Sequence, residues 1–153
     1  MNHNLLTFLI FICFSSSLYA VNDYAILSDK TPKALSEYDF FSDPLNQIPN
    51  SDVVPYELIT ALFSDYTDKH RFVYLPDGTT AKYEGEEVFD FPIGTALIKT
   101  FSYQTNEGGT LLLETRLLLN KEDGWDALTY VWDIDRGDAF LALGGKTIKV
   151  TDV

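Results

Sequence analysis

Three long strand-like segments in the second half of the chain constrain the fold more than any other feature. Residues 95–103, 110–120 and 126–134 are rich in apolar and β-branched side chains. A Gly-Gly pair separates the first two segments, and an Asp-Gly pair separates the second from the third. Loops this short join neighbouring antiparallel strands. We therefore predict a mainly β fold, an antiparallel sheet or sandwich with one or two short amino-terminal helices.

Weaker signals place the remaining elements. Residues 71–75 read as a short strand, which ends at the Pro-Asp-Gly-Thr turn of residues 76–79. Apolar residues at positions 58, 59, 62 and 63 have helical spacing, which predicts a short helix over 55–64. The other predicted elements are a short helix near 33–40, an extended segment at 80–83, and a last hairpin made of 140–143 and 147–150.

The first 20 residues read as a secretory signal peptide. They contain no Asp, Glu, Lys or Arg, and residues 5–14 are an apolar run too short to span a bilayer. Small residues follow, which predicts cleavage after Ala20. A membrane-anchoring stub is the alternative. We expect a periplasmic or secreted protein with no membrane span after cleavage, an extended leader with a short helix at 21–55, and a β-rich domain at 56–153.

Composition narrows the chemistry that the chain can perform. Cleavage after Ala20 would remove the only cysteine and leave His70 as the only histidine. A zinc site of the usual His and Cys kind is therefore not expected. The formal net charge of -12 repels phosphate backbones, so we expect no nucleic-acid partner.

Four charged residues on the long segments are predicted to form a structural charge ladder. Pairing Phe101 with Leu112 would put Lys99 opposite Glu114, and pairing Glu114 with Asp133 would put Arg116 beside Val131. Because side chains alternate along a strand, one face would then carry Lys99, Glu114, Arg116 and Asp133. The opposite face is the predicted core, with Ala96, Ile98, Leu111, Leu113, Leu117, Tyr130 and Trp132.

Two other interpretations of this charged face stay open. Glu114 and Asp133 could form a pair of carboxylates for acid–base catalysis, although the sequence suggests no nucleophile or metal beside them. Leu112 and Leu118 would share the face, so another module could cover it. The turn before the first long strand is predicted to be structural, because Pro92 fixes φ and Gly94 permits a positive φ.

A few further residues invite a functional interpretation and have a plainer one beside it. His70 could be a general base or an axial haem ligand, but a histidine in a loop is usually solvated. The Asp-rich residues 133–138 resemble a calcium loop only loosely, since the spacing and the terminal Glu do not fit. Trp125, Tyr130 and Trp132 could stack on sugar rings, or they could pack in the core.

An ordered set of short motifs resembles a known family. The motifs are LFSDY, RFVYLP, FPIGT, KTF, ETRLL and GW, and the similarity runs from about residue 35 to residue 150. The chain resembles the amino-terminal part of secreted bacterial diheme c-type cytochromes. The strand entry FPIGTALIKTF is also similar to one in cytochrome P460-type β domains.

The resemblance implies a function for the chain and places the haem elsewhere. The family carries Cys-x-x-Cys-His haem motifs downstream of this region, and no such motif is present here. We therefore expect no cofactor in this chain, with haem c only in a missing downstream region. The expected protein is a non-catalytic β domain of a cytochrome c-like electron-transfer protein, a truncated product or half of a split protein. Its partner would be a haem-bearing domain or redox protein. The alternative is a free-standing periplasmic module that binds a small molecule or carbohydrate.

Overall fold

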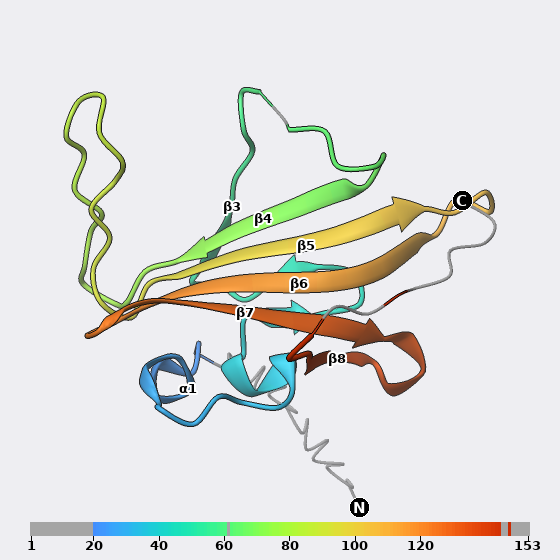
Figure 1. Cartoon of the computed structure of the whole chain (residues 1–153), viewed down its shortest axis with the longest axis horizontal. Coiled ribbons are helices and arrows are strands. Elements are labelled where there is room, and N and C mark those ends of the chain that lie inside the picture. The colour runs from blue at the N-terminus through green and yellow to red at the C-terminus, as the bar shows by residue number, and fades with distance from the viewer. Residues whose placement is uncertain (1–19, 61, 145–146, 148–153) are drawn as a thin grey trace, which may run out of the picture.

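A meander of six strands forms the body of the protein. The computed structural model describes residues 20–60, 62–144 and 147. The strands are β3 (Val53–Pro55), β4 (Asp68–Tyr74), β5 (Ala96–Gln104), β6 (Thr110–Lys121), β7 (Gly124–Asp133) and β8 (Asp138–Leu141). Each is antiparallel to the next, and their order in the sheet is their order in the sequence (Figure 1). The prediction of a mainly β fold is confirmed. No helix in the described part of the chain is long and apolar enough to cross a membrane.

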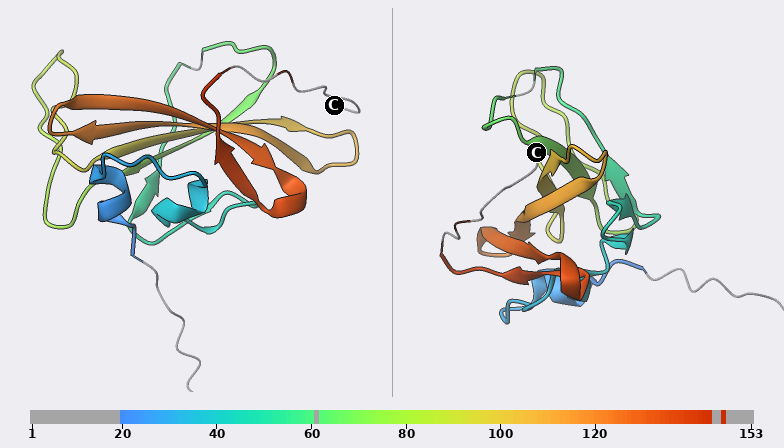
Figure 2. Two further views of the ribbon diagram at one scale, coloured as in Figure 1. Left: turned by 60° about the horizontal axis from the view of Figure 1, so that its bottom comes forward. Right: turned by 90° about the vertical axis from the view of Figure 1, so that its right-hand side faces the viewer.

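The amino-terminal segment lies against one face of this sheet, which we call the inner face (Figure 2). It contains helix α1 (Asp23–Leu27), the 3-10 turn η1 (Leu35–Tyr38) and a small two-stranded sheet of β1 (Phe41–Asp43) and β2 (Ile48–Pro49). Residues 21–55 therefore belong to the same core as the sheet. Within the described residues, the opposite face of the six-stranded sheet, which we call the outer face, carries no such layer of helix and strand, although its residues Arg71, Phe101 and Val131 are buried.

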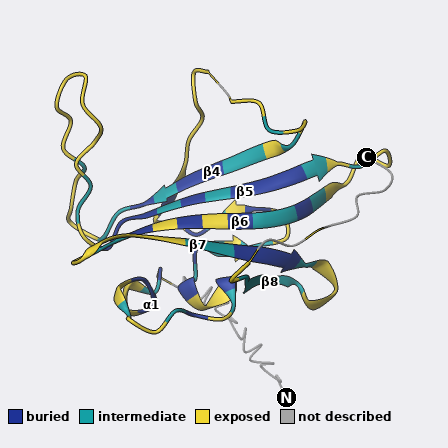
Figure 3. Ribbon diagram, viewed as in Figure 1, coloured by how far each residue is buried: buried dark blue, intermediate teal, exposed yellow. Residues whose placement is uncertain are grey.

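The core lies between the amino-terminal segment and the inner face. Central strand β5 is largely buried (Figure 3). The amino-terminal segment contributes fully or nearly fully buried Ile26, Leu35, Tyr38 and Phe40. Their buried partners on the sheet include Ala96, Ile98, Leu112, Leu117, Leu119, Tyr130 and Trp132. Burying one large apolar side chain contributes about 1.5–3 kcal/mol, so the contacts between these two layers are a main source of stability.

Buried hydroxyl groups tie the two layers together. The hydroxyls of Tyr38 and Tyr130 are 3.0 Å apart, and the Tyr130 hydroxyl donates to the carbonyl of Pro32 at 2.9 Å. Within the sheet, the hydroxyls of Thr100 and Thr115 are 2.7 Å apart. Buried polar groups that find partners in this way avoid the cost of desolvation without a hydrogen bond.

The edge strand β8 also contacts the amino-terminal segment directly. Ala34 forms an isolated antiparallel bridge with Phe140, and the Leu141 amide donates to the carbonyl of Lys33 at 2.9 Å. The Ser36 hydroxyl donates to the Asp138 carboxylate at 2.6 Å. These contacts pair part of the edge of β8 that faces away from β7.

The predicted registers differ from the structure by two residues, and a β-bulge adds a second difference. Phe101 lies opposite Glu114 instead of Leu112, and Glu114 lies opposite Val131 instead of Asp133. A shift of two residues keeps every side chain on its predicted face. The bulge between Phe101 and Ser102 then reverses the alternation along β6.

The reversal changes which leucines reach the core. Leu112, predicted on the charged face, is buried in the core. Leu113, predicted in the core, lines a hollow on the outer face, and Leu111 is half-buried. The sequence shows no glycine at the bulge, so alternation alone could not place it.

The helix predicted over 55–64 is wrong for the described residues of that range. Pro55 ends β3, and the Tyr56 amide continues the ladder by donating to the Arg71 carbonyl at 3.0 Å. Leu58, Ile59, Leu62 and Phe63 are exposed. An isolated helix of ten residues is marginal in water, and these exposed side chains supply little burial to stabilise one.

The other predicted elements vary in outcome. The helix near 33–40 is the short turn η1, whereas α1 was not predicted. In residues 80–83 the structure has only an isolated bridge between Lys82 and Asp90, within a protruding arm at 76–94. The signal peptide, apart from Ala20, and the last predicted strand, apart from Thr147, lie outside the described residues.

Candidate functional site

A row of cations crosses the outer face of the sheet. Arg71 on β4 lies opposite Lys99 on β5, and Lys99 lies opposite Arg116 on β6. Lys69 lies two residues before Arg71, and therefore on the same face. Like charges that face each other across strands destabilise a sheet. We call Lys69, Arg71, Lys99 and Arg116 the cationic row.

Two carboxylates neutralise part of the cationic row. The Nε atom of Arg116 donates to Glu114 Oε1 at 2.7 Å, two residues away on the same strand. Arg71 has only 6% of its side chain exposed, and it lies 3.5 Å from a carboxylate oxygen of the well-exposed Glu57. Lys69 bonds the carbonyl of Thr67 at 3.1 Å.

Lys99 differs from the other three cations, because no carboxylate or hydrogen-bond acceptor in the described part of the chain bonds its ammonium group. Its Nζ lies 4.7 Å from the ring centre of Phe101, and the guanidinium carbon of Arg116 lies 4.8 Å from the same ring. Burial lowers the pKa of Lys99, and the charges of Arg71, Arg116 and Lys69 lower it further. The folded protein thus holds an ammonium group where burial and three neighbouring cations disfavour the charge, while the Phe101 ring favours it.

Three adjoining hollows surround the exposed part of the row. One of about 610 Å³ includes Phe63, Phe101 and Leu113 in its lining, and one of about 380 Å³ includes Val131 and Leu143. A third, of about 320 Å³, lies over the middle strands and is lined mainly by apolar side chains. Arg116 lines all three, and Lys99 lines two. The cationic row therefore borders open, partly apolar space.

The predicted charge ladder only partly forms. Lys99, Glu114 and Arg116 share the outer face, as their alternation indicated, but Lys99 faces Arg116 rather than Glu114. Asp133 is not next to Glu114: it pairs with Asp138, and its carboxylate accepts from the Arg136 amide at 3.3 Å. The two carboxylates therefore lie in different surroundings, and the arrangement gives no support to a catalytic pair.

The other predicted residues lie away from the cationic row. Nε2 of His70 is 3.1 Å from the hydroxyl of buried Ser102, on the inner side of the sheet. Tyr130 and Trp132 are in the core, while Trp125 is 45% exposed at the start of β7. The Asp-rich residues 133–138 include the turn η2 (Ile134–Arg136). Nowhere in the described ranges do three or more His, Cys, Asp or Glu side chains gather as a metal site would require.

Pro92 and Gly94 form the turn that precedes β5. The Thr95 amide and hydroxyl both donate to the carbonyl of Pro92, at 3.2 and 2.7 Å, and Gly94 has a φ of +91°. This turn fixes where β5 begins. It thereby sets which residues of the strand face outward.

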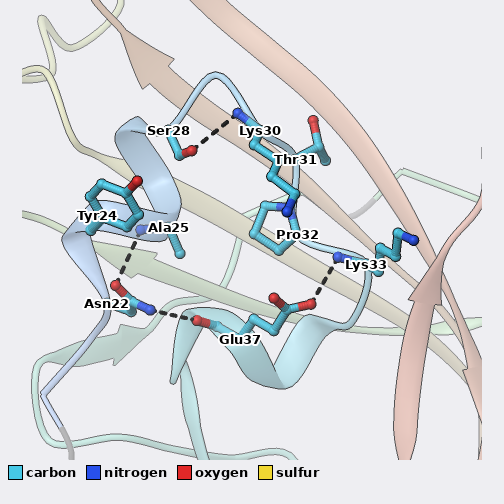
Figure 4. Close-up of a pocket in the computed structure, with 9 residues that line it drawn as sticks. All are labelled: Asn22, Tyr24, Ala25, Ser28, Lys30, Thr31, Pro32, Lys33 and Glu37. Carbon is cyan, nitrogen blue, oxygen red and sulfur yellow. Dashed lines mark hydrogen bonds between the residues drawn. The ribbon is translucent and has the colours of Figure 1, made fainter.

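A separate hollow lies at the amino-terminal segment, between α1 and η1 (Figure 4). It has a volume of about 550 Å³, and many of the polar atoms around it bond to each other. Asn22 accepts from the Ala25 amide and donates to the Glu37 carbonyl, while the Glu37 carboxylate accepts from the Lys33 amide at 2.9 Å. Lys30 and Lys33 are exposed. These bonds hold the loop, so we regard the hollow as structural.

Sequence reasoning missed half of the cationic row. Lys69 and Arg71 were not among the predicted site residues. Their spacing of two, the same as that of Glu114 and Arg116, was the available signal, because it puts both on one face of a strand. Their alignment with Lys99 depends on the β4–β5 register, which the sequence does not specify.

Comparisons of the chain with protein-family models, with curated proteins and with solved structures find no match. The resemblance to the diheme cytochromes therefore stays a prediction.

Proposed function

We propose that the chain is a non-catalytic domain that acts by binding, and that its ligand or partner covers the outer face of the sheet. The observation that carries this proposal is the cationic row, in which Lys99 has like-charged neighbours across both adjacent strands. A residue kept only for stability would not combine partial burial with facing cations. Groups that are costly to the fold and border a hollow are typical of functional sites.

Binding is favoured over catalysis by how the acid–base side chains are engaged. Glu114 is held by Arg116, Asp133 accepts from a backbone amide, and His70 meets a serine hydroxyl on the inner side. General acid–base catalysis needs such groups to converge on one reacting atom. These three do not converge.

The resemblance to secreted c-type cytochromes supports a specific setting for the binding domain. In that setting the protein is periplasmic or secreted, the haem c belongs to the downstream region, and the partner is a haem-bearing domain or redox protein. The exposed part of the outer face, around Arg116 and Leu118, gives such a partner a surface to contact.

Carbohydrate binding is the second candidate, and an aromatic series on the arm favours it. The rings of Tyr83, Phe89, Phe91 and Trp125 follow one another with centres 5.7, 5.9 and 6.0 Å apart. Tyr83 is 69% exposed and Phe89 is 52% exposed. Exposed rings of this kind offer apolar faces to sugars.

A nuclear magnetic resonance titration of the ¹⁵N-labelled chain tests both candidates. Mixtures of organic acids, amino acids, nucleotides and sugars are added, and the shifted amides are mapped. Ligands of the outer face should shift amides in 97–99, 116–118 and 127–129. They should lose affinity with Lys99→Met and keep it with Lys82→Met, a matched loss of charge on the arm.

The titration separates the two candidates. Shifts confined to residues 83–91 and 125 would transfer the binding function to the aromatic arm. Outer-face shifts unaffected by Lys99→Met would remove the basis of our proposal. If neither small molecules nor a soluble c-type cytochrome shifts any amide, both candidates fail.

A further inference from the structure

We propose that the ligand of the outer face is a small organic carboxylate with an apolar body. Its carboxylate would contact Lys99 and Arg116, and its body would lie in the adjoining apolar hollow over β5, β6 and β7. This inference rests on the proposed binding function and names the chemistry of the same site.

The anionic end of the ligand is assigned by the free bonding capacity of the two cations. Lys99 has three donor hydrogens and forms no ion pair or hydrogen bond with any described residue. The Arg116 side chain is 58% exposed, and its Nε atom donates a hydrogen bond to Glu114 Oε1. One of its terminal nitrogens lies close to the same oxygen. Its remaining N–H groups can donate to a second carboxylate. A carboxylate between the two would also relieve the repulsion between them.

The apolar body is assigned by the hollow of about 320 Å³ beside these cations. Its other lining residues are mostly apolar, and include Tyr56, Leu97, Leu118 and Ala127. Leu118 lies on β6, which has a neighbouring strand on each side, and it is nevertheless 43% exposed. The volume is at the small end of the range for ligand pockets, about 300–1,000 Å³, which favours a compact ligand.

The overall charge of the chain argues against larger anions at this site. With a formal net charge of -12, the protein repels a polyanion such as a nucleic acid or an anionic membrane at long range. Salt screens that repulsion beyond about 8 Å at physiological ionic strength. A small monoanion can therefore enter the hollow and meet the local positive charge, whereas an extended anionic surface would also meet the surrounding carboxylates.

The ligand assignment is tested by titrating the full chain with three probes and following its amide signals. Octanoate has both parts, octanamide keeps the apolar body without the charge, and acetate keeps the charge without the body. We expect octanoate to bind at least tenfold more tightly than either of the others, and to shift amides in 97–99, 116–118 and 127–129. Lys99→Met should weaken octanoate binding at least tenfold, and Lys82→Met should leave it unchanged.

Each contrary result overturns a defined part of the inference. Equal binding of octanamide would remove the role of the anion, and equal binding of acetate would remove the role of the apolar hollow. If octanoate shifts no outer-face amide but another compound or a cytochrome does, this inference fails and the proposed function stands. Amide dispersion checks that Lys99→Met is folded, and Lys99→Gln serves as the second variant, with the same expected loss of octanoate affinity.

Discussion

Replacing Gly94 with alanine should be one of the most damaging single-methyl changes in the protein. Gly94 has a φ of +91°, and a Cβ atom there would lie 2.7 Å from the side-chain Cγ of Pro76. Its amide donates to the carbonyl of Asn120 at 2.8 Å. The Asn120 side chain in turn donates to the carbonyl of Phe91 at 2.8 Å. The turn thus anchors the base of the arm to the end of β6.

The magnitude follows from two separate costs. A non-glycine residue with a left-handed backbone costs about 1–2 kcal/mol. Carbon atoms in contact prefer about 3.5–4.0 Å, so Pro76 must also move by roughly 1 Å. Overpacking of this kind costs about 1–3 kcal/mol. Gly94→Ala should therefore lower the free energy of unfolding by about 2–5 kcal/mol.

Gly78→Ala is the matched control, since it isolates the backbone cost. Gly78 has a φ of +72°, and a Cβ atom there would meet nothing within 4 Å. We expect this variant to lose only about 1–2 kcal/mol. Urea denaturation followed by tryptophan fluorescence measures both free energies of unfolding. A loss for Gly94→Ala no larger than that for Gly78→Ala would refute the packing of this turn against Pro76.

The remaining predictions concern buried hydroxyls, the cationic row, export and cofactor content. Tyr130→Phe should lower the free energy of unfolding, measured by urea denaturation, by about 1–3 kcal/mol, because the Pro32 carbonyl and the Tyr38 hydroxyl each lose a hydrogen-bond partner. An unchanged free energy of unfolding would contradict the buried hydroxyl network. Lys99→Met should raise the free energy of unfolding by up to about 1 kcal/mol at pH 7, because it removes a charge that faces like charges. Folding lowers the pKa of Lys99, so the wild-type protein becomes more stable as the pH rises toward the ordinary lysine value of 10.5. The stability advantage of Lys99→Met should therefore shrink at high pH. An advantage that does not change with pH would reject charge repulsion as its cause. Intact-mass analysis of exported protein should show cleavage after Ala20, and a membrane-bound product that keeps Met1 would reject it. The purified chain should be colourless, and a Soret band that survives acid–acetone extraction would contradict this, since it would mean covalent haem.

Sequence patterns predicted the β class and the long strands because local signals specify both. Alternation and glycine-containing loops locate β5, β6 and β7 to within a few residues. The same patterns put Lys99, Glu114 and Arg116 on one face. Which of them face each other depends on register, which turn geometry and packing decide together. That is why the row of like charges was predicted as a ladder of opposite charges.

Other features depend on contacts between distant segments, which a local pattern cannot reveal. The bulge at Phe101 and Ser102 carries no glycine, and it decides whether Leu112 or Leu113 reaches the core. The apolar spacing at 58–63 predicted a helix where the structure has exposed side chains beside the outer face. In the first place strand pairing decides the outcome, and in the second the apolar spacing lacks the burial that would support a helix.

The bridge between Ala34 and Phe140 has a consequence for how the chain folds. The sheet is a meander, so its hairpins can form from contacts that are local in sequence, which favours rapid folding. The amino-terminal segment, by contrast, contacts β8, so Lys33 and Ala34 must wait for partners that are synthesised more than 100 residues later. Until β8 is complete, Leu35 and Tyr38 lack some of their packing partners, and the layer over the inner face is unfinished. The slowest folding step should therefore be the docking of this segment, and the open sheet that precedes it is the state most prone to aggregation.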